Sequence, residues 1–165
     1  MLFSLQAGYK MNPEESAQSF SYFIPTLGFD YKLVPNGKLV LATKWKAHWN
    51  FGDGFQFFQA ASLGANDGLR GYRNQRFSGK SAFYQNTDLR WNVTKMKTSF
   101  LPVYMGVYGG FDYGRVWIDN DPSNRWNTSY GGGIFFDGAH ILTARAAVFA
   151  ADEGIRFSFG VGFGF

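Results

Sequence analysis

The sequence predicts an all-β fold, a transmembrane antiparallel up-and-down β-barrel of about eight strands. Residues 155–165 place a large apolar side chain at every odd position and arginine, serine or glycine at every even one, which is the period of a strand with one apolar face. The chain is 20% aromatic, yet its mean hydropathy is −0.21 and no stretch approaches the ~18 to 20 apolar residues of a membrane helix. Barrels produce this combination because polar residues facing the lumen halve the hydrophobicity of each strand.

The length of 165 residues allows one domain, residues 1–165, and eight strands of ~9 to 11 residues with their turns. In the first alternating segment, residues 2–10, one face carries Phe3, Leu5, Ala7 and Tyr9. The second, about 18–33, follows a polar loop at 11–17 and ends at Pro35-Asn36-Gly37, where Asn-Gly signals a tight turn. The third, 39–49, carries Trp45 and Trp49 outward, and Lys44, Lys46 and His48 inward.

Five further strands follow a long loop at about 50–79, which we expect to be extracellular. The fourth strand alternates from Phe83 to Val93, and the fifth alternates from Leu101 to Gly114 with Val107 on the lipid face. Turn-forming residues at 119–124 precede a sixth strand near 127–137. A turn at Asp137-Gly138 leads to the seventh, 140–150, and residues 151–154 lead to the eighth. An even strand number leaves both termini on one side, the periplasm in bacterial barrels.

Charged residues are expected on the inward face of these strands. They are Lys44, Lys46, His48, Asp88, Arg90, Asp112, Arg145 and Arg156. Buried charges must find partners in any barrel, so we interpret the set as a paired structural core rather than a catalytic site. We expect no catalytic residues, metal or cofactor, because the chain has no cysteine and its histidines, His48 and His140, fall near opposite ends of the barrel.

The net charge of +4 does not indicate nucleic-acid binding, because lysines and arginines are scattered through the strands rather than clustered. The alternation begins directly after Met1, without a secretory signal peptide. Since an outer-membrane protein must be exported, we expect this sequence to be a mature or excised chain.

The long loop contains Leu69-Arg70-Gly71-Tyr72, and the two strands after it contain Asp88-Leu89-Arg90 and Phe111-Asp112-Tyr113-Gly114. Together these motifs resemble the BamA-like barrel superfamily, also called the bacterial surface antigen family, which includes outer-membrane insertases and two-partner-secretion transporters. The resemblance implies that Arg70 folds back to the barrel wall and contacts Asp88 and Asp112. The chemistry agrees, because an arginine fork can bridge two carboxylates and both aspartates have inward parity. Gly71 would give the loop tip a backbone conformation closed to other residues.

The same resemblance implies a C-terminal signal read by the barrel-assembly machinery, matched by Phe159, Gly160, Phe163 and Phe165. Family barrels usually have about sixteen strands behind periplasmic domains, so this chain matches a C-terminal half. We therefore expect a bacterial outer-membrane barrel module, in contact with lipid, that anchors an absent N-terminal domain or forms part of a protein insertion or translocation barrel. The partner domain could be fused or separate, periplasmic or on the surface. The alternatives are a half-barrel that homodimerises into a larger pore and a small lipid-acting outer-membrane enzyme.

Overall fold

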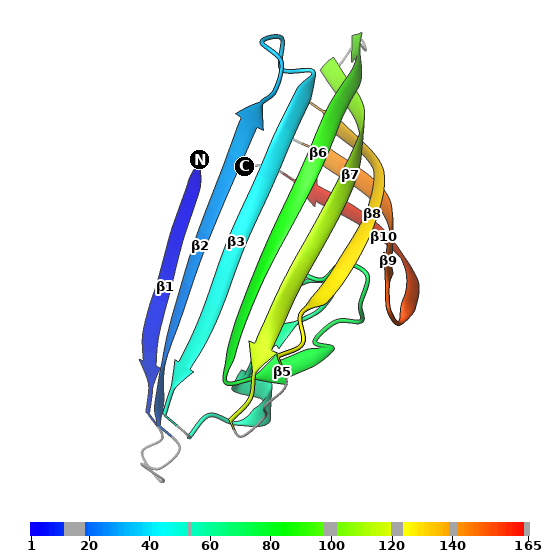
Figure 1. Ribbon diagram of the computed structural model, residues 1–165. Coiled ribbons are helices and arrows are strands. Elements are labelled where there is room, and N and C mark those ends of the chain that lie inside the picture. The colour runs from blue at the N-terminus through cyan, green and yellow to red at the C-terminus, as the bar shows by residue number, and fades with distance from the viewer. Residues whose placement is uncertain (12–18, 53, 98–101, 120–123, 139–141, 164–165) are drawn as a thin grey trace.

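The computed structural model describes residues 1–11, 19–52, 54–97, 102–119, 124–138 and 142–163. These form an eight-stranded antiparallel sheet in which strands adjacent in the sheet follow one another along the chain (Figure 1). The strands are β1 (Leu2–Lys10), β2 (Phe20–Lys32), β3 (Leu39–Phe51), β6 (Ser81–Lys97), β7 (Pro102–Trp117), β8 (Asn127–Gly138), β9 (Leu142–Ala151) and β10 (Gly154–Phe163). The all-β class and the eight strands are confirmed.

Closure into an eight-stranded barrel is not observed, so that part of the prediction was wrong. The two edge strands of the sheet are β1 and β10, and each of these two pairs with a neighbour on one side only. The sheet is instead a curved wall, with the chain between β3 and β6 packed inside its curve (Figure 1). The physical reason is space, because side chains alone fill the interior of an eight-stranded barrel and leave no room for such a segment.

The convex face of the sheet is apolar and exposed. Trp91, Val107 and Ile134 are neighbours across β6, β7 and β8, and all three are exposed. On β10, Phe157 and Phe159 are 78% and 77% exposed. Exposed apolar residues on this scale mark a surface that meets lipid or another protein rather than water. Among the described residues, no helix is long and apolar enough to span a membrane.

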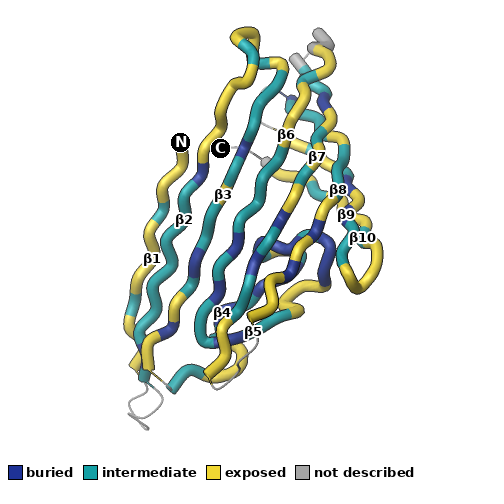
Figure 2. The backbone as a smooth tube through the Cα atoms, in the orientation of Figure 1, coloured by how far each residue is buried: buried dark blue, intermediate teal, exposed yellow. Residues whose placement is uncertain are grey.

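The core lies between the segment after β3 and the concave face of the sheet. Residues 52–80, which we call the inner loop, hold the 3-10 helix η2 (Phe57–Gln59) and a hairpin of β4 (Ala61–Leu63) and β5 (Phe77–Gly79). Leu63, Leu69 and Tyr72 of the inner loop pack with Ala82 and Tyr84 of β6. Buried residues therefore gather where the inner loop meets β6, β7 and β8 (Figure 2). The sequence predicted the inner loop but not these elements within it.

Two predicted turns are present. Gly37 has a φ of 69° after Asn36, whose Oδ1 accepts a hydrogen bond from the Lys38 backbone N–H. Residues 152–153 connect β9 to β10, and Gly154 follows with a φ of 127°. Most of the loops at 11–17 and 119–124, together with His140 and Phe165, lie outside the described residues. The start of β1 and the end of β10 lie toward the same end of the sheet (Figure 1).

Candidate functional site

Arg70, near the tip of the inner loop, reaches two carboxylates on the concave face. Its Nη2 donates hydrogen bonds to Asp88 Oδ1 on β6 at 2.7 Å and to Asp112 Oδ1 on β7 at 2.5 Å. Its Nε lies 3.0 Å from both oxygens of Asp112. One guanidinium therefore ties the loop to two adjacent strands, a geometry that lysine could not reproduce with its single ammonium group.

Asp112 is the fixed end of this contact, because its side chain is 0% exposed. Besides the Arg70 guanidinium, it accepts hydrogen bonds from the Arg70 backbone N–H at 3.1 Å, Ser129 Oγ at 2.8 Å and Asn86 Nδ2 at 2.6 Å. A buried carboxylate needs hydrogen bonds to both of its oxygens, since an oxygen without a partner would carry a desolvation penalty. We call Arg70, Asp88 and Asp112, with Asn86 and Ser129, the latch cluster.

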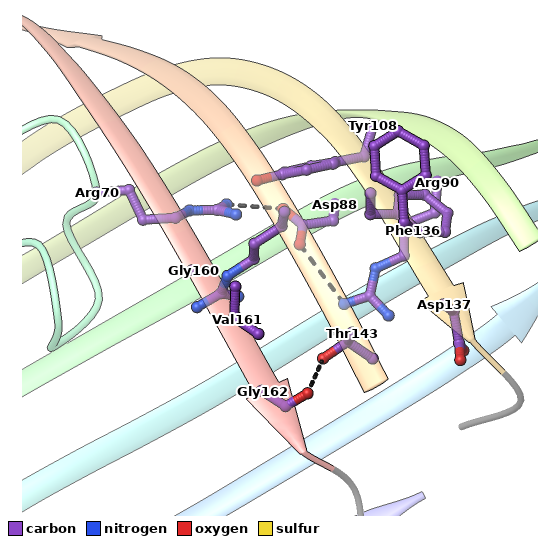
Figure 3. Close-up of a pocket in the computed structure, with 12 residues that line it drawn as sticks. Arg70, Asp88, Arg90, Tyr108, Phe136, Asp137, Thr143, Gly160, Val161 and Gly162 are labelled. Carbon is purple, nitrogen blue, oxygen red and sulfur yellow. Dashed lines mark hydrogen bonds and ion pairs between the residues drawn. The ribbon is translucent and has the colours of Figure 1, made fainter. Parts of the chain in front are cut away.

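The surroundings keep Arg70 charged. Its guanidinium carbon lies 4.2 Å from the centre of the Phe149 ring on β9, a side chain only 1% exposed. Burial alone would lower the pKa of Arg70, but its hydrogen bonds to Asp112 and Asp88 outweigh burial and raise the pKa above its ordinary value. Asp88 also faces Arg90, whose Nη2 lies 3.6 Å from Asp88 Oδ2 (Figure 3).

Asn86 connects the latch cluster to the loop backbone. The same amide nitrogen that reaches Asp112 also donates to the Gly68 carbonyl oxygen at 2.7 Å. Gly68 has a φ of 89°, and a Cβ there would collide with the Tyr84 ring. Asn86 was not among the predicted site residues. The sequence signal that could have identified Asn86 is its inward position on β6, two residues before Asp88 and opposite Asp112 on β7.

Comparison with known proteins gives one family. The sequence profile of the haemolysin secretion/activation proteins ShlB/FhaC/HecB matches residues 3–136, most of the chain. The chain belongs to the ShlB/FhaC/HecB family. These are two-partner-secretion transporters of the BamA-like superfamily, so the predicted superfamily is confirmed. No curated protein matches, and neither does any solved structure.

Membership of the ShlB/FhaC/HecB family implies a bacterial outer-membrane β-barrel transporter module. The family consists of transporters rather than enzymes. Within the described residues, no group of three or more His, Cys, Asp or Glu could hold a metal ion. The contacts of the latch cluster between the inner loop and the sheet are hydrogen bonds and ion pairs.

Three glycines make room for the inner loop. A Cβ at Gly110 would lie 2.6 Å from both Arg70 Nη2 and Asp88 Oδ1, so Gly110 gives the ion pair its space. The motif residue Gly114 leaves room for Leu63 Cδ1, 3.0 Å from its virtual Cβ. The explanation offered for Gly71 was wrong. Gly71 does not have a positive φ. A glycine is required there because a Cβ would approach Ser129 and Ala151 within 2.9 Å.

The rest of the predicted site is dispersed. Tyr72 is 2% exposed and packs edge-on against Phe77, with ring centres 5.1 Å apart. On β10, Phe159 points outward and Gly160 lies opposite Arg145. Phe163 ends that strand. The role of these C-terminal residues in assembly stays a prediction.

The inward charges pair only in part. Lys46 on β3 lies 3.4 Å from Asp67 of the inner loop. Arg90 reaches Asp88 and, at 3.7 Å, Asp30. The His48 ring hydrogen-bonds Asn50 at 3.1 Å. Within the described part of the chain, Lys44, Arg145 and Arg156 form no ion pair, so the predicted fully paired core is not observed.

Proposed function

We propose that this chain forms part of the wall of a polypeptide-translocating outer-membrane barrel, and that its inner loop is a plug held in place by the latch cluster. Family membership supports the transport role, and the exposed apolar convex face supports a position in lipid. The inner loop supports the plug, because it packs against the concave side, the side that faces the lumen in a barrel.

The observation that carries this proposal is the contact between Arg70 and the buried Asp112. A polypeptide cannot pass through space that the inner loop fills, so the loop must be displaced during transport. The contact is strong enough to hold the loop at rest, because its charges are largely removed from water. It is also reversible, because it contains no covalent bond.

The test is the permeability of the outer membrane in cells that express the protein. Arg70→Met removes the guanidinium, so the plug should loosen and cells should become more sensitive to a large hydrophilic antibiotic that the intact outer membrane excludes. Arg76→Gln is the matched control. Arg76 lies on the same loop and is 47% exposed, and its ion pair with Glu153 spans 2.6 Å. Wild-type permeability in the Arg70→Met strain, at equal protein levels, would refute the plug.

The open edges of the sheet favour a second arrangement. In a bilayer, β1 and β10 must pair with further strands, because lipid cannot satisfy their free backbone groups. Those strands come from the same polypeptide or from a second copy of this chain. Light scattering of the detergent-solubilised chain, with the detergent mass subtracted, tests the second copy. A dimer would support a shared barrel, whereas a monomer would exclude it.

We further propose that the termini face the periplasm, that the inner loop enters from the extracellular side, and that the barrel-assembly machinery inserts the chain. A membrane anchor for a fused or separate domain is compatible with the same wall. Protease added to intact cells should cleave sites at the inner-loop end of the strands and spare a tag at the N-terminus. Cleavage of the tag alone would reverse this orientation.

A further inference from the structure

The concave face beside the latch cluster is hollow and carries an excess of positive charge. A cavity of about 680 Å³ is lined by the inner loop and by residues from β1, β2, β3, β6, β7, β9 and β10. Five cationic side chains line it, against two carboxylates, Asp30 and Asp88. They are Lys44, Arg70, Arg90, Arg145 and Arg156. A second hollow of about 470 Å³, drawn in Figure 3, shares Arg70, Asp88, Arg90 and Arg145 with the first and is also lined by Asp137. Because they share these residues, we treat the two hollows as one charged space.

Two of the five cations are neutralised within the site. Arg70 is paired with Asp88 and Asp112, and Arg90 lies between Asp88 and Asp30. These contacts account for both carboxylates that line the larger cavity, whereas a further carboxylate, Asp137, lines the second hollow. The other three cations form no ion pair with the part of the chain that the structure describes, and the five cations of this space exceed its four carboxylates, Asp30, Asp88, Asp112 and Asp137, by one charge.

Arg145, Arg156 and Lys44 are these three. Arg156 Nε is buried and has no hydrogen-bond partner among the described residues. Arg145 lies opposite Gly160 on β10, whose virtual Cβ would lie 3.3 Å from Arg145 Nε, so the missing side chain leaves room for the guanidinium to cross that strand. Lys44 Nζ lies 5.9 Å from the centre of the Tyr84 ring, an aromatic contact that does not neutralise its charge.

Unbalanced charges beside a wall of low dielectric create a strong field, and such a field concentrates counter-ions. A buried guanidinium nitrogen without a partner also gains from any acceptor that reaches it. We propose that this cavity is an anion site that binds the carboxylates of an acidic polypeptide segment. This inference rests on the proposed function for its source of ligand, a polypeptide in the lumen. The charged strand residues that line the cavity occupy inward positions, which alternate with the exposed apolar positions.

The experiment compares two labelled peptides of equal length, one rich in glutamate and one rich in lysine, by fluorescence anisotropy with the whole chain refolded in zwitterionic detergent. The glutamate peptide should bind and the lysine peptide should not. The double variant Arg145→Gln with Arg156→Gln should weaken binding by about tenfold or more, because each arginine would supply a charge-assisted hydrogen bond.

The matched control is Arg76→Gln with Arg125→Gln. It removes the same two charges outside the cavity, where these arginines pair with Glu153 and Asp152. Its affinity should stay within about twofold of wild type. Equal weakening by both double variants would reduce the effect to net charge and overturn the site. Absence of any preference for the glutamate peptide would overturn it as well.

Two further measurements keep the outcome decisive. Arg145→Lys with Arg156→Lys preserves the charge and should bind the glutamate peptide even if the glutamine variant fails to fold. Inorganic phosphate that binds while the glutamate peptide does not would show a small-anion site and refute the polypeptide ligand. Both assays use purified protein without transport, so a failed plug test and a failed anion site are distinguishable.

Discussion

Replacing Arg70 by Met and Asp112 by Asn, singly and together, measures how strongly the latch cluster holds the inner loop. Arg70→Met keeps the length of the side chain but leaves the Asp112 charge without a partner in a fully buried position. Asp112 would retain its bonds from Ser129, Asn86 and the residue-70 backbone. Leaving one member of a buried ion pair unpaired costs about 3–5 kcal/mol, so we expect that loss in the free energy of loop opening.

Asp112→Asn should cost less, because Arg70 keeps its 2.7 Å bond to Asp88. Loss of hydrogen bonds to a charged group predicts about 1.5–3 kcal/mol. The double variant removes both charges, and its cost should fall short of the sum of the single costs by about 1.5 kcal/mol or more, which is the coupling expected of a close charge pair.

Trypsin can report this opening, because Arg73 and Arg76 are exposed on the same loop and remain in every variant. Brief digestion across a series of urea concentrations gives the fraction of molecules with an open loop, while heat-modifiable electrophoretic mobility reports the barrel wall separately. Arg125→Met is the control, since its exposed ion pair with Asp152 should contribute less than about 1 kcal/mol. Additive costs in the double variant, or wild-type cleavage of Arg70→Met, would show that Arg70 does not hold the loop.

Three other substitutions test separate parts of the structure. Gly110→Ala should destabilise the docking of the inner loop by about 1–3 kcal/mol, because the added methyl group would enter the Arg70–Asp88 ion pair. Gly109→Ala is the control, since its Cβ would meet only the Gly131 carbonyl oxygen at 3.9 Å. Equal effects of the two substitutions in the same digestion assay would exclude this packing. Gly68→Ala should cost about 1–3 kcal/mol for its positive φ alone, and unchanged trypsin sensitivity would contradict the observed turn. Val107→Arg should lower refolding stability in lipid vesicles by about 2–4 kcal/mol, and a negligible change would remove Val107 from the lipid face.

The inward positions of the strand residues in the candidate site could be predicted from the alternation of the strands. Asp88 and Asp112 have inward parity on strands that follow the inner loop, whereas the choice of Arg70 rested on the resemblance of its motif to the BamA-like superfamily. Asn86 shares this parity, but a single asparagine on an inward face carries no signal of its own. Gly68, Gly110 and Gly71 have their roles because of atoms that lie far away in sequence, so each depends on a contact that only the folded chain makes.

The eight strands, their exposed apolar face and the family of transporters could be predicted from the sequence alone, because a period of two and a short motif are local properties of the chain. The open, curved wall in place of a closed barrel, and the three inward cations that form no ion pair among the described residues, were visible only in the folded chain. Curvature and charge balance depend on how the inner loop packs against strands far away in sequence. Packing of that kind is set by shape and contact, which alternation does not encode.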